Sequence, residues 1–173
     1  MMSESVAEFL TKKLKQLPSD TIETLKVLSC FGQVDMITIQ VLDRGQFVLN
    51  MIESLESAME VGFIDRAGPI FAFSHDMLQE SACNLIPIDE KMALHKKLTM
   101  SLVQDAKIAE NAEIYTLAVN QINTFQDLGG VLKPEDCCLF AQLNLVAGKY
   151  SMSTKNPTMR KVSSFMPQSK VFA

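Results

Sequence analysis

The chain of 173 residues is long enough for one hydrophobic core or two small domains, and its apolar content of 47% lies well above that of disordered chains. It contains no run of about 18 uncharged apolar residues, so we expect no membrane span. All 20 acidic side chains lie at or before Asp136, whereas 5 of the 16 basic side chains follow it. An acidic body argues against a domain that binds duplex DNA, so we expect no specific nucleic-acid partner.

The N-terminal residues are acidic and lack the apolar core of a signal peptide, which argues for a cytoplasmic protein. The cysteines show no C-x-x-C spacing, and with only two histidines they make no zinc pattern. We therefore predict buried free thiols and no metal site. The cysteines concerned are Cys30, Cys83, Cys137 and Cys138.

The first 17 residues predict an N-terminal helix over 4–16, with one apolar side made by Val6, Phe9, Leu10, Leu14 and Leu17. Pro18 ends this helix, and Ser19 is a good N-cap for the next, which Gly32 ends. A short helix follows at 35–43, with Asp35 as its possible cap.

The periodicity predicts a further helix over 46–60, whose stripe is formed by Val48, Met51, Ile52, Leu55 and Met59. Two short strands follow at 63–66 and 69–73, joined by Ala67-Gly68. Three helices followed by a hairpin is the winged-helix order, so we predict a winged-helix module over 18–86.

The second half predicts helices and no strands. Apolar spacing places them at 75–85, 88–106, 109–127 and 134–151. We predict antiparallel helical hairpins of the tetratricopeptide type over 87–152, and a disordered basic tail over 153–173. The fold class is therefore mainly α, with a winged-helix module, a small β-hairpin and helical hairpins.

The pair His75-Asp76 lies where the second strand gives way to a helix. In the simplest interpretation Asp76 or Ser74 caps the helix while His75 packs on the wing. In the alternative, His75 faces an anion at the positive helix N-terminus. We expect His95 to be a hydrogen-bonded structural histidine and not a metal ligand.

No phosphate loop and no nucleophile constellation occur, so we expect no catalytic residue and no enzyme activity from this chain alone. The helix in the DNA-recognition position carries three acidic residues and no Lys or Arg, which disfavours DNA binding through the wing. Its acidic residues are Glu53, Glu56 and Glu60.

Several stretches resemble the segment that follows the ATPase core in STAND-type, AAA-like signalling ATPases, whose chains often end in a kinase or a nucleotide cyclase. They are Phe73-Ser-His-Asp-Met-Leu-Gln-Glu-Ser-Ala, Leu85-Ile-Pro, Met92-Ala-Leu-His95 and Ala141-Gln-Leu-Asn-Leu-Val-Ala-Gly148. The resemblance implies a winged helix after a P-loop module, followed by a tetratricopeptide-like array. Relatives carry a Met-His-Asp motif after the wing. There the His reaches the ADP phosphate and holds the closed state.

His75 and Asp76 match the last two positions of that motif, and Ser74 replaces the Met. The resemblance implies a nucleotide-sensing role for His75 and Asp76. ADP or ATP would be bound only through an ATPase domain that this chain lacks, so we expect no cofactor here.

We therefore expect a non-catalytic regulatory part of a multidomain signal-transduction ATPase, which couples nucleotide state to a helical protein-interaction region. Its partner would be another protein or the adjacent ATPase domain. The alternative is a stand-alone helical adaptor that binds a protein without nucleotide. Winged-helix DNA binding is a third hypothesis.

Overall fold

The computed structural model describes residues 5–45, 47–48, 50–109 and 112–153. The elements, in chain order, are α1 (Val6–Leu14), α2 (Ser19–Ser29), β1 (Gln33–Asp35), α3 (Met36–Arg44), α4 (Met51–Glu60), β2 (Ile64–Ala67), β3 (Ile70–Phe73), α5 (Asp76–Asn84), α6 (Ile88–Ala109), α7 (Ala112–Asp127) and α8 (Pro134–Ser153). The prediction of a mainly α fold with a small β-hairpin is confirmed. From residue 154 onward, the predicted basic tail lies outside the described residues.

The sheet is antiparallel, with β3 between β1 and β2. The β2–β3 hairpin is the predicted wing, and its turn passes through Gly68 at φ +62°, a conformation that favours glycine. Arg66 Nε donates to the Gly68 carbonyl oxygen at 3.0 Å, and its guanidinium lies over the Phe71 ring. Strand β1, which pairs Val34 with Phe71, was not predicted, because three residues are too few to show an alternating pattern.

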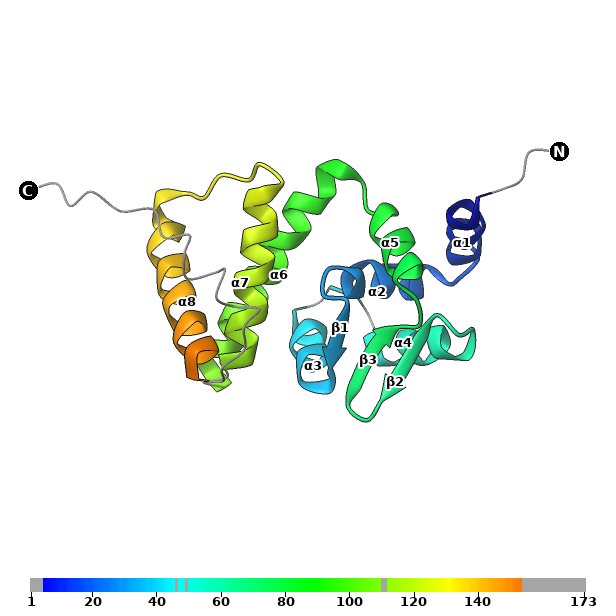
Figure 1. Ribbon diagram of the computed structural model, residues 1–173, viewed down its shortest axis with the longest axis horizontal. Helices are drawn as coiled ribbons and strands as arrows, with labels where there is room; N and C mark the ends of the chain where they lie inside the picture. The colour runs from blue at the N-terminus through cyan, green and yellow to red at the C-terminus, as the bar shows by residue number, and fades with distance from the viewer. Residues whose placement is uncertain (1–4, 46, 49, 110–111, 154–173) are drawn as a thin grey trace, which may run out of the picture.

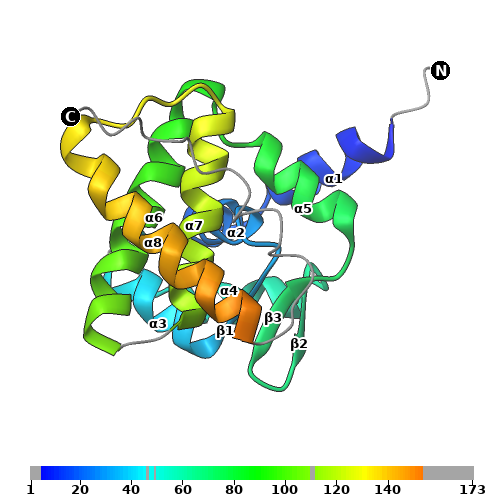
Figure 2. The same cartoon turned by 60° about the vertical axis from the view of Figure 1, so that its left-hand side comes forward.

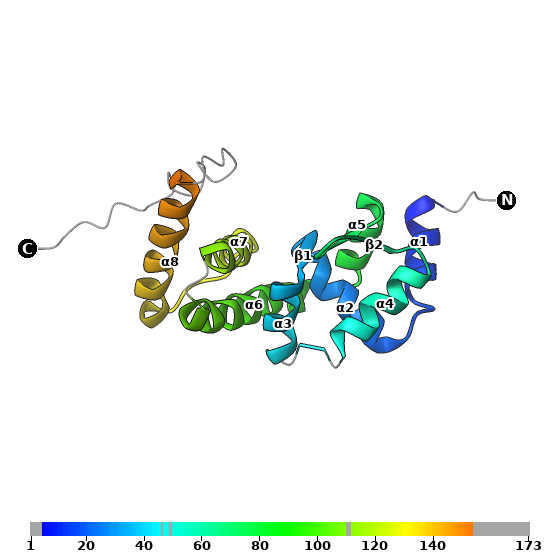
Figure 3. The ribbon, with the colours of Figure 1, turned by 90° about the horizontal axis from the view of Figure 1, so that it is seen from below.

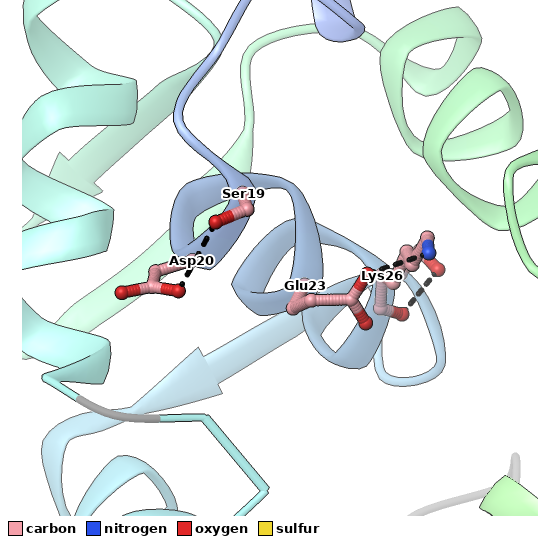
Figure 4. A network of polar contacts seen from close by, with 5 residues as sticks. Ser19, Asp20, Glu23 and Lys26 are labelled. Atoms are coloured by element: carbon pink, nitrogen blue, oxygen red, sulfur yellow. Dashed lines mark hydrogen bonds and ion pairs between the residues drawn. The ribbon is translucent and has the colours of Figure 1, made fainter.

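Local capping explains where the first helices begin. Ser5 and Glu8 form a capping box at α1, and the Asp35 carboxylate accepts from the Thr38 N–H at 2.8 Å at the start of α3, as predicted. Ser19, predicted as a cap, is instead the first residue of α2, and Pro18 occupies the cap position. Figure 4 shows the polar side of α2, where Lys26 Nζ pairs with Glu23 Oε1 at 2.7 Å.

Two predicted apolar faces differ from the structure. Helix α4 begins at Met51 and not at residue 46, because Asn50 takes a left-handed conformation (φ 54°). Ile52 is 39% exposed, so the buried face of α4 is formed by Met51, Leu55 and Ala58. On α1, Val6 and Phe9 are also exposed, since this helix contacts the rest of the fold mainly through α5 (Figure 1).

The core has two apolar clusters. One fills the winged helix around Leu25, Ile39, Leu55 and Phe71, and the other joins α6, α7 and α8 around Leu102, Ile122 and Leu143. Their memberships cross the predicted boundary at residues 86–87. Leu98 of α6 belongs to the first cluster, and Val41 of α3 belongs to the second.

Helix α6 therefore lies between the winged helix on one side and α7 and α8 on the other, as Figure 3 shows from below. Helix α8 contacts α7 and is the outermost helix at this end, in front of α6 and α7 in Figure 2. Among the described residues, no helix is both long enough and apolar enough to cross a membrane.

Candidate functional site

Ser74 and His75 form the junction between β3 and α5. The Ser74 N–H donates to the Phe63 carbonyl oxygen at 3.1 Å, and Ser74 Oγ donates to the Gly62 carbonyl oxygen at 2.9 Å. These bonds tie Ser74 to the base of the wing, so its hydroxyl does not cap α5. They fix the direction in which the chain leaves the sheet at His75.

His75 occupies the N-cap position of α5 in an extended conformation, and its side chain makes no capping hydrogen bond. Its carbonyl oxygen accepts from the Leu78 and Gln79 N–H groups at 2.9 and 3.3 Å. The residue is exposed, so its ring is not buried against the wing. Asp76 is the first residue of the helix and is also exposed, which places a carboxylate at the positive end of the helix dipole.

A second group of polar residues is buried, between the winged helix and the helical hairpins. His95 of α6 lies with its Nδ1 2.7 Å from Gln121 Oε1 on α7, and Gln121 Nε2 donates to the Cys30 carbonyl oxygen at 3.0 Å. An amide oxygen only accepts, so His95 Nδ1 must carry the proton in this bond. His95 is thus a buried, hydrogen-bonded residue, as predicted.

We call the linked groups of His95, Gln121 and the Cys30 carbonyl the His95–Gln121 bridge. The bridge and Gln79 supply hydrogen-bond donors to the main-chain carbonyl groups at the C-terminal end of α2. Gln79 Nε2 of α5 donates to the Ser29 carbonyl oxygen at 3.1 Å, next to the Cys30 carbonyl that Gln121 reaches. Carbonyl groups in the last turn of a helix have no partner within the helix, and both of these receive a side-chain amide from a different helix. Sequence reasoning assigned neither glutamine this role. The available signal was a glutamine on the apolar side of a predicted helix.

Burial decides the ionisation of the groups around this bridge. It lowers the pKa of His95, partly opposed by the hydrogen bond to Gln121, and so favours the neutral ring. Burial, reinforced by Cys83, raises the pKa of Cys30 to about 12, so this thiol stays protonated and is a poor nucleophile. The bridge therefore holds neutral groups suited to a structural role.

The four thiols are free. Cys137 and Cys138 are exposed on α8, so the prediction that the cysteines are buried is wrong for this pair. Among the described residues, no group of three His, Cys, Asp or Glu side chains is arranged to hold a metal ion.

The outer side of α4 is acidic. Glu53, Glu56 and Glu60 are exposed on this helix, which precedes the wing and carries no Lys or Arg. A helix used to read a DNA groove must approach phosphates, and this surface would repel them.

No protein-family model matches the chain, and no curated protein or solved structure matches it either.

Proposed function

We propose that this chain is the non-catalytic regulatory part of a multidomain, STAND-type (AAA-like) signal-transduction ATPase of the cytoplasm. Its winged helix would couple the nucleotide state of an adjacent P-loop domain to the helical region, which would bind a protein partner. The parent protein would bind ADP or ATP and would carry a kinase or cyclase output.

The observation that carries this proposal is the pair of side-chain amides at the end of α2. Gln79 from α5 and Gln121 from α7 bind adjacent carbonyl groups of the winged helix, and His95 of α6 orients Gln121. Helix α5 begins at His75, so a displacement of that residue by a ligand would act on the helix that holds the Ser29 carbonyl. The neighbouring Cys30 carbonyl is bound by Gln121 of α7, so adjacent carbonyl groups connect α5 and α7 and would give a short route from the wing to the hairpins.

The exposure of the His75 side chain and its lack of a capping bond support its proposed role as the residue that senses the nucleotide. Its side chain is exposed and caps nothing, while the neighbouring Ser74 is fixed to the wing by two hydrogen bonds. An imidazole held in this way at a helix N-terminus can donate to a phosphate presented by another domain. Asp76 would limit the approach of the anion and help to position α5.

The test uses a protein that joins this chain to a P-loop domain. His75→Ala should weaken ADP binding by about 1.5–3 kcal/mol, the range for a hydrogen bond to a charged group, while His75→Gln should retain part of the affinity. Asp76→Asn is the control for a change of charge at the same helix end, and it should not weaken ADP binding. An ADP affinity that is the same in wild type and His75→Ala would refute the sensing role.

A stand-alone adaptor is the second candidate function. It is supported by Val6 and Phe9, apolar side chains that α1 leaves exposed. Under this alternative Phe9→Ser would abolish binding to a protein partner, and His75→Ala would change neither partner binding nor its dependence on nucleotide.

A further inference from the structure

Two free thiols lie on neighbouring helices of the winged helix, next to the carbonyl groups that the side-chain amides bind. Cys30 is the C-cap of α2, and Cys83 lies near the end of α5. Helices α2 and α5 pack side by side (Figures 1 and 3). Both cysteines are only partly buried, so a small solute can reach this region.

The contacts of Gln79 bring this part of α5 to Cys30. Gln79 Nε2 donates to the carbonyl oxygen of Ser29 at 3.1 Å, and it lies 3.2 Å from the position that a Cβ atom on Gly32 would occupy. Cys83 follows Gln79 by about one helical turn, and residues four apart lie on the same side of a helix. Cys83 therefore lies on the side of α5 that faces the end of α2.

The Cys30 thiol lies on the matching side of α2. Its Sγ donates to the Lys26 carbonyl oxygen at 3.6 Å, so the side chain turns back along the helix. Burial is the main cause of the raised pKa of Cys30 and Cys83 is the second, so the two sulfur atoms lie within range of an electrostatic interaction. The two thiols are thus neighbours across the contact between α2 and α5.

We propose that Cys30 and Cys83 form a reversible disulfide when the chain meets hydrogen peroxide, and that this bond fixes α5 to the end of α2. In the first step the Cys83 thiolate attacks a peroxide oxygen. An S–O bond forms, the O–O bond breaks, and the leaving hydroxide takes up a proton to become water. Cys83 attacks first because the Cys30 thiol stays protonated.

In the second step the Cys30 sulfur attacks the sulfenic acid of Cys83. The S–S bond forms, the S–O bond breaks, and the leaving hydroxide takes the proton of Cys30. In total, two thiols are oxidised to one disulfide while one hydrogen peroxide molecule is reduced to two water molecules.

The disulfide would join helices that hydrogen bonds already connect. Gln79 and Gln121 bind the adjacent carbonyl groups of Ser29 and Cys30, so a covalent bond at Cys30 keeps α5 against the end of α2 even when the Gln79 bond opens. The bond also closes a long loop of chain, which should stabilise the folded state. The inference does not depend on the proposed ATPase function.

The first experiment uses the full chain with Cys137→Ser and Cys138→Ser, two exposed positions, so that only Cys30 and Cys83 remain. After treatment with hydrogen peroxide and alkylation of the remaining thiols, mass spectrometry of the digested monomer should show the Cys30 peptide joined to the Cys83 peptide. Dithiothreitol should release both thiols. The oxidised chain should melt about 5 °C or more above the reduced chain. Two free thiols after peroxide treatment, or a disulfide that forms only in urea, would overturn the proposal.

The second experiment tests the order of the two steps in the same background. Cys30→Ala leaves Cys83 without a partner thiol, so its sulfenic acid should persist and react with dimedone. The matched control is Cys83→Ala, in which the protonated Cys30 should give little dimedone adduct. Neither variant should gain melting temperature on oxidation. Dimedone labelling of Cys30 and not of Cys83 would refute the order, and a higher melting temperature in either oxidised variant would show that the gain does not come from the disulfide.

Discussion

Gln121 of α7 donates its side-chain amide to the main-chain carbonyl oxygen of Cys30, 91 residues earlier in the chain, at 3.0 Å. The same amide accepts from the His95 ring, so one side chain links α2, α6 and α7. The His95 and Gln121 side chains are buried and Cys30 is partly buried, so water cannot readily replace a lost partner and an unmade hydrogen bond there is costly. This bond ties the end of α2 in the winged helix to α7 in the helical hairpins.

Removal of this amide should destabilise the protein. Gln121→Ala leaves the His95 N–H and the Cys30 carbonyl without their partner, and each buried polar group left unpaired costs about 1–3 kcal/mol. Urea unfolding should therefore show a loss of roughly 2 kcal/mol or more in the free energy of unfolding. Gln126→Ala, an exposed position on the same helix, is the control and should change this quantity little. Equal stability of Gln121→Ala and wild type would mean that the bond contributes nothing.

The lowered pKa of His95 predicts how stability depends on pH. Burial, the main cause, makes the folded-state pKa lower than the ordinary value of 6.5, so the unfolded chain binds the proton more readily. The contribution of neutral His95 is complete above 6.5 and is lost as the pH falls below it. Unfolding in urea at several pH values should show this decline, and His95→Gln should reduce it. A decline of equal size in His95→Gln would assign it to other groups.

Leu55→Asp should unfold the winged helix. Leu55 is 1% exposed at the centre of the first core cluster, and burial of an unpaired carboxylate costs several kcal/mol, roughly 3 or more. The control is Ile52→Asp on the same helix, where 39% exposure leaves the carboxylate in contact with water. Thermal denaturation should show a large loss for the first variant and a small one for the second; similar losses in both would mean that exposure does not govern the effect.

Duplex DNA should bind weakly and without sequence preference. The exposed carboxylates of Glu53, Glu56 and Glu60 make the outer side of α4 repel phosphates. Fluorescence anisotropy with labelled duplexes should give no Kd near 10⁻⁸ M, the value typical of specific sites at physiological salt. A Kd of that order that depends on sequence would contradict the inference that α4 does not read a DNA groove.

Signals that lie close together in the sequence predicted much of the fold. Asp35 predicted the start of α3, and the hairpin with its Ala67-Gly68 turn could be read from alternating residues and a glycine. Strand β1 could not, because it is defined by its pairing with β3 and not by its own three residues. Ile52 was misassigned because a stripe of apolar residues on a helix does not show how wide the buried strip is.

The candidate site also has one part that the sequence predicted and one part that it did not. The position of His75 at a strand-to-helix junction follows from local pattern, and the structure places it there. The bond between Gln121 and Cys30 depends on how α2, α6 and α7 pack, and a single sequence carries no record of contacts across 91 residues. In the sequence, such a contact is indicated only by a glutamine on the otherwise apolar face of a helix.

Helix α6 contributes Leu98 to one core cluster and Leu102 to the other. Division of the chain near Pro87 would therefore remove core side chains from both halves. The fragment before Pro87 would lack Leu98 in its core cluster, and the fragment after it would lack Val41 in its own. Neither half should give a soluble folded product when expressed alone. When the two halves are produced together in one cell, they should associate and fold by fragment complementation, with α6 as the helix that packs against both core clusters.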